Sequence, residues 1–177
     1  MKNAFRNTLL TALLVAALPA QAALQSYSFN GTLDSGLNTG ESFFGNFSFD
    51  DSSLLNSGQE YLGANSFSIS FLGNTYSMAE QAAPTDVVFL DGSFLGVSYA
   101  YDATFPKFSL IASGGTGESW DVPYLAYSQQ GMSGVVVEGA GSIVYAPVPE
   151  PETYALMLAG LGLLGLAARR RKQQQAS

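Results

Sequence analysis

The sequence contains no cysteine and no histidine. Their absence excludes the Ser-His-Asp triad, Cys-His nucleophiles and the usual zinc, copper and haem sites. It also means that no disulfide stabilises the fold. The glycine-rich phosphate-binding motifs and the G-x-S-x-G nucleophile motif are missing as well. Only carboxylate chemistry remains, and nothing in the sequence selects a pair of carboxylates, so we expect a protein that is not an enzyme.

Positive charge is almost absent from the middle of the chain. Lys107 is the only basic residue between positions 23 and 147, and against twelve carboxylates it leaves a net charge of about −11, compared with −7 for the whole chain. So acidic a body is repelled by nucleic acid and by anionic lipid, and we expect no nucleic-acid partner. The acidity is typical of a solubilising surface. A cation site built from some of the carboxylates is the alternative.

The first 22 residues have the three parts of a secretory signal peptide. Lys2 and Arg6 form a positive start, residues 9–18 form a short apolar run, and Ala-Gln-Ala at positions 20–22 gives the small-x-small pattern that signal peptidase reads. The apolar run is too short to cross a membrane. We therefore predict export, with signal peptidase as a processing partner and cleavage after Ala22.

Residues 23–146 are predicted to form one all-β domain, an antiparallel β-sandwich or jelly roll. Short runs alternate apolar and small polar residues, as strands with one buried face do, and no crossover helices intervene. In residues 65–72 the pattern predicts that Phe67, Ile69 and Phe71 face the core while Ser66, Ser68 and Ser70 face outward. The predicted strands cover residues 26–33, 42–49, 65–72, 86–90, 94–101, 107–112, 122–128, 134–139 and 141–146.

Glycine and asparagine mark the turns between these strands, because they tolerate the positive φ that tight turns demand. Asp91-Gly92, between two Phe-Leu pairs, is the strongest hairpin signal. Gly139-Ala140-Gly141 is predicted to separate the last two strands. Residues 50–63 are predicted to form a long loop.

Four residues are candidates for ligand binding. Asp50, Asp51 and Asp102 are candidate Ca²⁺ ligands, because calcium takes six to eight oxygens and turn aspartates supply them. No EF-hand loop supports them, and aspartates that simply begin turns are the alternative; we expect no other cofactor. Trp120, the only tryptophan, lies among acidic residues and is a candidate for stacking on a sugar ring. A core or edge role is the alternative for Trp120.

Residues 147–172 combine three features in a fixed order. Prolines at positions 147, 149 and 151 favour an extended segment. Residues 154–168 carry no charge and would form a helix of about 22 Å, a short single transmembrane helix beside a hydrocarbon core of about 30 Å. A basic cluster follows and marks the cytoplasmic side; it consists of Arg169, Arg170, Arg171 and Lys172.

These residues resemble the PEP-CTERM sorting domain of Gram-negative bacteria, with Val148-Pro149-Glu150-Pro151, the apolar helix and the arginines matching its three parts. Segments of this kind are also called ice-binding protein C-terminal domains, a name that implies nothing about ice binding. The resemblance implies that exosortase, a membrane-embedded cysteine protease-transpeptidase, recognises Pro149, Glu150 and Pro151 and processes the protein. Carriers of such segments are usually linked to extracellular polysaccharide and biofilm surfaces.

We therefore expect an exported protein, first anchored in the inner membrane and then released to the cell surface or extracellular matrix. Its body is expected to be a non-enzymatic structural or binding module that contacts exopolysaccharide. Two alternatives for the body stay open: a small carboxylate-dependent hydrolase of the glycosidase kind, and a calcium-dependent adhesin. For the tail, the alternative is a permanent anchor without processing.

Overall fold

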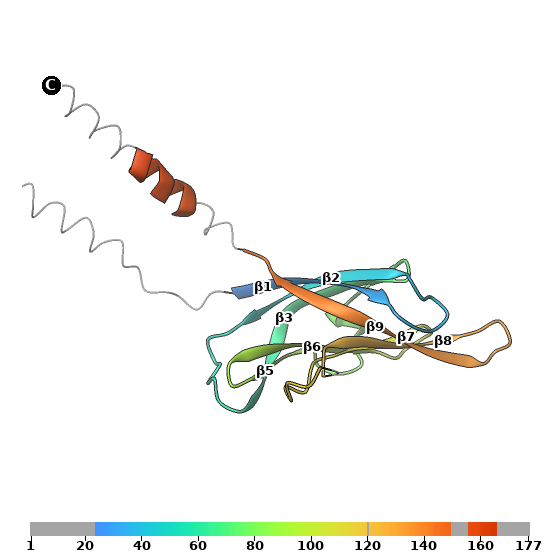
Figure 1. The fold of residues 1–177 in the computed structure, drawn as a ribbon. Helices are drawn as coiled ribbons and strands as arrows, with labels where there is room; N and C mark the ends of the chain where they lie inside the picture. The colour runs from blue at the N-terminus through green and yellow to red at the C-terminus, as the bar shows by residue number, and fades with distance from the viewer. Residues whose placement is uncertain (1–23, 120, 150–155, 166–177) are drawn as a thin grey trace, which may run out of the picture.

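The computed structural model describes residues 24–119, 121–149 and 156–165. These residues form an all-β body, followed by a helix over residues 156–165 (Figure 1). Several predicted features lie outside the described residues: the signal peptide 1–22, Trp120, Glu150, Pro151, both ends of the predicted transmembrane helix (154–155 and 166–168) and the basic residues 169–172.

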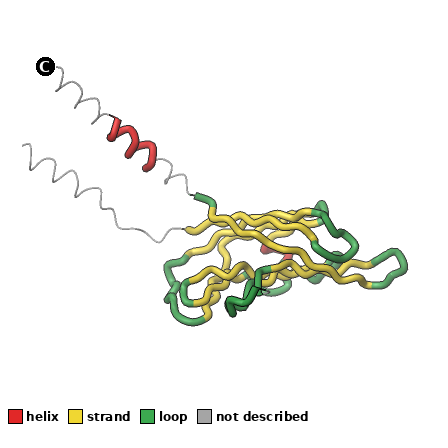
Figure 2. Tube along the Cα trace, viewed as in Figure 1, coloured by secondary structure: helices red, strands yellow, loops and turns green. Residues whose placement is uncertain are grey.

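The body consists of antiparallel strands and one 3₁₀ turn. Figure 2 shows that the strands make up most of the body and that the loops gather mainly at its two ends. The elements are β1 Leu24–Leu33, β2 Ser42–Asp50, β3 Gln59–Phe71, β4 Asn74–Ser77, η1 Met78–Glu80, β5 Asp86–Leu90, β6 Ser93–Tyr101, β7 Lys107–Ile111, β8 Tyr124–Gln130 and β9 Val136–Pro147.

Eight of the strands close into a barrel, so the predicted sandwich is wrong although the antiparallel all-β class is confirmed. The neighbours run β2-β1-β9-β8-β7-β6-β5-β3, and β3 pairs with β2 to complete the ring, with β4 as an additional strand beside β3. Closure depends on the length of β3, which pairs with β5 through residues 59–63 and with β2 through residues 64–70. The first of these segments was predicted to belong to a loop. A closed ring leaves no open sheet edge, which an isolated sheet must protect in other ways.

Aromatic side chains fill the barrel. Phe67 stacks on Tyr99 with ring centroids 4.2 Å apart, and Phe71 contacts Phe108 at 4.7 Å. The predicted faces of this strand are confirmed, because Phe67, Ile69 and Phe71 are all buried while Ser66, Ser68 and Ser70 are exposed or half-exposed. The alternation of aromatic and small polar residues therefore has a simple cause: one face lines the core and the other meets solvent.

Of the two glycine turns predicted from the sequence, one is confirmed and the other is wrong. Asp91 and Gly92 have φ of 48° and 76° and join β5 to β6 as a two-residue hairpin, as predicted. Gly139-Ala140-Gly141, in contrast, lies inside the single strand β9. There a Cβ on Gly139 would collide with the ring of Tyr127, so this glycine serves close packing and not a turn.

Both described termini of the barrel lie at one end, which we call the tail end. The start of β1 and the end of β9 meet there (Figure 1). Tyr27 of β1 pairs with Pro147 of β9, and the Val148 N–H donates to the Ser26 carbonyl at 2.8 Å. Because the strands run antiparallel, this end also carries the β2–β3 loop, the β5–β6 turn and the β7–β8 loop. The opposite end, the far end, carries the β1–β2 loop and the β8–β9 hairpin loop.

Candidate functional site

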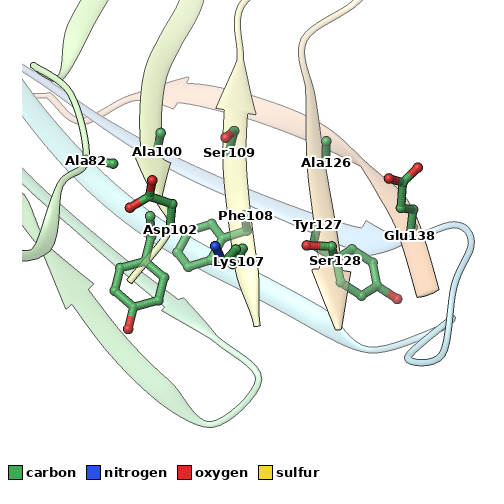
Figure 3. Close-up of a pocket in the computed structure, with 12 residues that line it drawn as sticks. Ala82, Ala100, Asp102, Lys107, Phe108, Ser109, Ala126, Tyr127, Ser128 and Glu138 are labelled. Atoms are coloured by element: carbon green, nitrogen blue, oxygen red, sulfur yellow. The ribbon is translucent and has the colours of Figure 1, made fainter. Parts of the chain in front are cut away.

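A shallow groove crosses the outer face of β6, β7, β8 and β9 and has a volume of about 530 Å³. Its floor is made of small residues, because Ala100, Ser109 and Ala126 pair across neighbouring strands and point outward (Figure 3). Phe108 and Tyr127, which alternate with these residues along β7 and β8, point into the core and are buried. Large side chains on these strands point into the core and small ones point outward. The outer surface is therefore recessed along the row of small residues.

Longer polar side chains border the floor on one side. Lys107 pairs with Ser128, and Ser128 pairs with Glu138, so the three lie in a row across β7, β8 and β9. Asp102 directly follows β6 and completes the border (Figure 3). The Lys107 ammonium lies 5.8 Å from the centroid of the Phe105 ring, within the range of a cation–π contact. The groove thus offers carboxylate acceptors and one cationic donor.

An exposed aromatic side chain stands on the same surface. Tyr124 lies two residues before Ala126 on the outer face of β8 and is 40% exposed. Side chains two residues apart on a strand point to the same face, about 6.6 Å apart. Tyr124 therefore provides an aromatic surface next to the groove floor.

The β7–β8 loop at the tail end is organised by Asp121. Its carboxylate accepts hydrogen bonds from the Gly114 amide at 2.5 Å and from the amide and hydroxyl of Thr116, each at 2.6 Å. The Ser113 hydroxyl adds a further bond at 3.0 Å. These donors, first of all the Thr116 hydroxyl, lower the pKa of Asp121 to about 2. Trp120, the predicted stacking residue, precedes Asp121 but lies outside the described residues.

The three candidate calcium ligands occupy separate structural roles. Asp50 ends β2, where its carboxylate accepts the Ser52 amide at 2.8 Å, an interaction that lowers its pKa. Asp51 lies in the loop that follows, and Asp102 borders the groove beyond β6. Among the described residues no three carboxylates gather in a way that could hold a metal ion. The structure thus does not bring Asp50, Asp51 and Asp102 together in one site.

The tail begins directly at the barrel. Strand β9 continues through Pro147, one residue beyond the predicted domain boundary, and Val148 is still bonded to β1. Residues 156–165 form a helix whose side chains are exposed. Within the part of the chain that the structure describes, no helix is both long and apolar enough to cross a membrane.

The PEP-CTERM protein-sorting motif matches residues 147–172, and the chain therefore carries this sorting signal. The motif implies an exported protein that is processed by exosortase and sorted to the cell surface. No curated protein and no solved structure matches the chain.

Of the residues that line the groove, the sequence pointed only to Asp102 as a candidate ligand-binding residue. The floor is built from alanine and serine on separate strands, and neither residue type signals a ligand by itself. Only the strand register, which sets Ala100, Ser109 and Ala126 side by side, makes them a surface.

Proposed function

We propose that the barrel is a non-enzymatic binding module that holds exported polysaccharide in the groove across β6–β9. The observation that carries this proposal is an open groove with a low floor of small residues, polar side chains along one border and Tyr124 beside it. Its volume of about 530 Å³ lies within the range of small-molecule sites, roughly 300–1,000 Å³. The sorting motif implies export and sorting to the cell surface, which supports a role in contact with exported polymers.

The chemistry of the groove suits sugar rings. Carboxylates and the Ser128 and Ser109 hydroxyls are hydrogen-bond partners for sugar hydroxyl groups. An exposed tyrosine offers an apolar face and a polar tip to the same ligand. Because the groove is open along the row of small residues, a polymer can enter from the side without threading through a closed cavity.

Binding fits the positions of the carboxylates better than hydrolysis does. Asp102, which follows β6, and Glu138 of β9 stand at opposite ends of the polar row. Strands β6 and β9 are separated by three spacings of about 4.8 Å, or roughly 14 Å along the sheet. Glycosidases need their two carboxylates about 5 to 9.5 Å apart across the bond that is cleaved. The proposal therefore favours a binding module over the glycosidase-like alternative.

Anchoring in the inner membrane belongs to the same proposal. The apolar segment 154–168 would hold the precursor in the inner membrane, with Arg169, Arg170 and Arg171 on the cytoplasmic side, until exosortase releases the body to the cell surface or matrix.

The test is polysaccharide binding by the full-length chain in detergent, measured by affinity electrophoresis in gels containing the exopolysaccharide of the native host. Ser109→Arg places a long side chain across the groove floor and is expected to weaken binding more than tenfold, or about 1.4 kcal/mol. Tyr124→Ala is expected to weaken it as well. Neither change touches the buried face of the barrel.

Matched controls come from the opposite outer face. Ser68 is also a half-exposed serine in the middle of a strand, so Ser68→Arg adds the same charge and bulk away from the groove. Tyr61 is 60% exposed on β3, and Tyr61→Ala is the control for Tyr124→Ala. Equal loss of binding in the control variants, or retained binding with Ser109→Arg, would show that the groove is not the site.

A further inference from the structure

We propose that the tail end of the barrel is itself a docking surface for exosortase, with Leu55 of the β2–β3 loop as its most exposed apolar contact. The inference rests on exosortase processing, which the sorting motif implies, and it is independent of what the groove binds. Exosortase would then recognise the tail end of the folded barrel as well as the sorting motif.

The sorting motif lies directly beside the barrel. The matched motif starts at residue 147, which is still part of β9, and Val148 donates its N–H to the Ser26 carbonyl. Pro149, the first residue of the Pro-Glu-Pro sequence, follows Val148 directly, so no linker separates the motif from the barrel. An enzyme that binds Pro149-Glu150-Pro151 must therefore accommodate the end of the barrel at the same time.

The surface that such an enzyme would meet at the tail end carries exposed apolar side chains. Leu55 is 81% exposed in the β2–β3 loop. Leu24 at the start of β1 and Val148 after β9 are each about half exposed. The three belong to one end of the barrel, because Leu24 pairs with Asp50, from which the β2–β3 loop departs.

The loop that presents Leu55 is held in place. The Glu60 carboxylate accepts the Leu55 amide at 2.7 Å, and the Gly58 amide donates to the Asp91 carboxylate at 2.7 Å. A loop whose backbone is already fixed loses little backbone conformational freedom when a partner covers it. Apolar residues that gather on one part of a surface mark sites of protein–protein contact.

The negative charge of the tail end favours a protein partner, exosortase, over the lipid surface. The tail end also carries the carboxylates of Asp50, Asp51 and Asp91, and the body has only one basic residue, Lys107. Anionic headgroups would repel this end, whereas a protein partner can present basic side chains to it. Exosortase is the protein that must come close to this end, since it acts on residues tethered there.

The test compares Leu55 with Leu37, an exposed leucine in the β1–β2 loop at the far end. Leu55→Ser and Leu37→Ser remove the same apolar side chain from opposite ends of the barrel. In the native host, pulse-chase labelling measures conversion of the full-length precursor to the released form, and a strain without exosortase is the negative control. We expect Leu55→Ser to slow conversion several-fold and Leu37→Ser to leave it unchanged, with equal melting temperatures for both variants.

A photo-crosslinking amino acid at position 55 or 37 identifies the occupant. Crosslinks from position 55 to tagged exosortase, with none from position 37, would support the docking surface. Crosslinks from position 55 to lipid alone, equal conversion rates for Leu55→Ser and the unaltered chain, or conversion that continues without exosortase would overturn the proposal.

Discussion

The ring of Phe43 lies directly over Gly31 on the neighbouring strand, and one step along the same two strands Phe29 lies over Gly45. The arrangement is reciprocal: each strand contributes one ring and one glycine. All four residues belong to β1 and β2, and both rings are buried in the core. The glycines are therefore needed for close approach of the rings and not for an unusual backbone conformation.

We expect Gly31→Ala to destabilise the barrel by about 1–3 kcal/mol, the usual cost of overpacking a core. The new Cβ would collide with the Ser142 carbonyl of β9 as well as with the Phe43 ring, so relief requires a shift of the β1–β9 ladder. Gly63→Ala is the control, because a Cβ at that strand position meets nothing within 4 Å. Urea unfolding followed by circular dichroism would measure the stability of both variants. Equal unfolding midpoints for Gly31→Ala and Gly63→Ala would contradict the packing role of Gly31.

Phe71 is a core residue whose truncation should be costly. It is fully buried and contacts the rings of Phe43, Phe108 and Tyr127. Phe71→Ala is expected to lower the free energy of unfolding by about 3–5 kcal/mol. Phe44 is 62% exposed on the outer face of β2, so Phe44→Ala should change stability by no more than about 0.5 kcal/mol. A small effect of Phe71→Ala would mean that the core repacks around the cavity.

The sequence predicted most strands because the two faces of the barrel differ so strongly in chemistry. It failed at closure, because no local pattern shows that β3 pairs with β5 through residues 59–63 and with β2 through residues 64–70, or that β1 pairs with β9 at the other end of the body. It also failed at Gly139 and Gly141, where two glycines two residues apart looked like a turn. Their actual role, room for neighbouring side chains, depends on residues more than ten positions away.

The sorting signal, in contrast, could be read from the sequence in full. Its information lies in the order of prolines, apolar residues and arginines, which does not depend on the fold. The groove depends on strand register alone, so its residues could not be predicted before the barrel was known.

The Asp121 carboxylate should make the β7–β8 loop sensitive to acid. Its pKa is lowered to about 2 in the fold, whereas an unfolded aspartate titrates near about 3.9. Its contribution to stability is therefore fully present above about pH 4 and is lost as the pH falls toward 2. Protection of the Gly114 and Thr116 amides against hydrogen exchange, measured relative to the intrinsic rate at each pH, should be lost over this interval.

Asp121→Asn should cause the same loss of protection of these two amides at neutral pH. The amide nitrogen of asparagine cannot accept the hydrogen bonds that the second carboxylate oxygen accepts. Glu118→Gln removes one charge from the same loop and keeps the hydrogen bonds of Asp121, so exchange at Gly114 should stay slow. Fast exchange in both variants would point to net charge and not to the hydrogen bonds.

The sorting motif predicts which form of the tail reaches the cell surface. We expect the mature protein from the native host to lack everything beyond about Pro151, because exosortase acts at the motif and the apolar segment stays in the membrane. Replacing Pro149, Glu150 and Pro151 with alanine should leave membrane association of the precursor unchanged, since the apolar residues and the arginines remain, and should abolish release. Mass spectrometry of the C-terminal peptide decides the matter: recovery of mature protein ending at Ser177 would favour a permanent anchor.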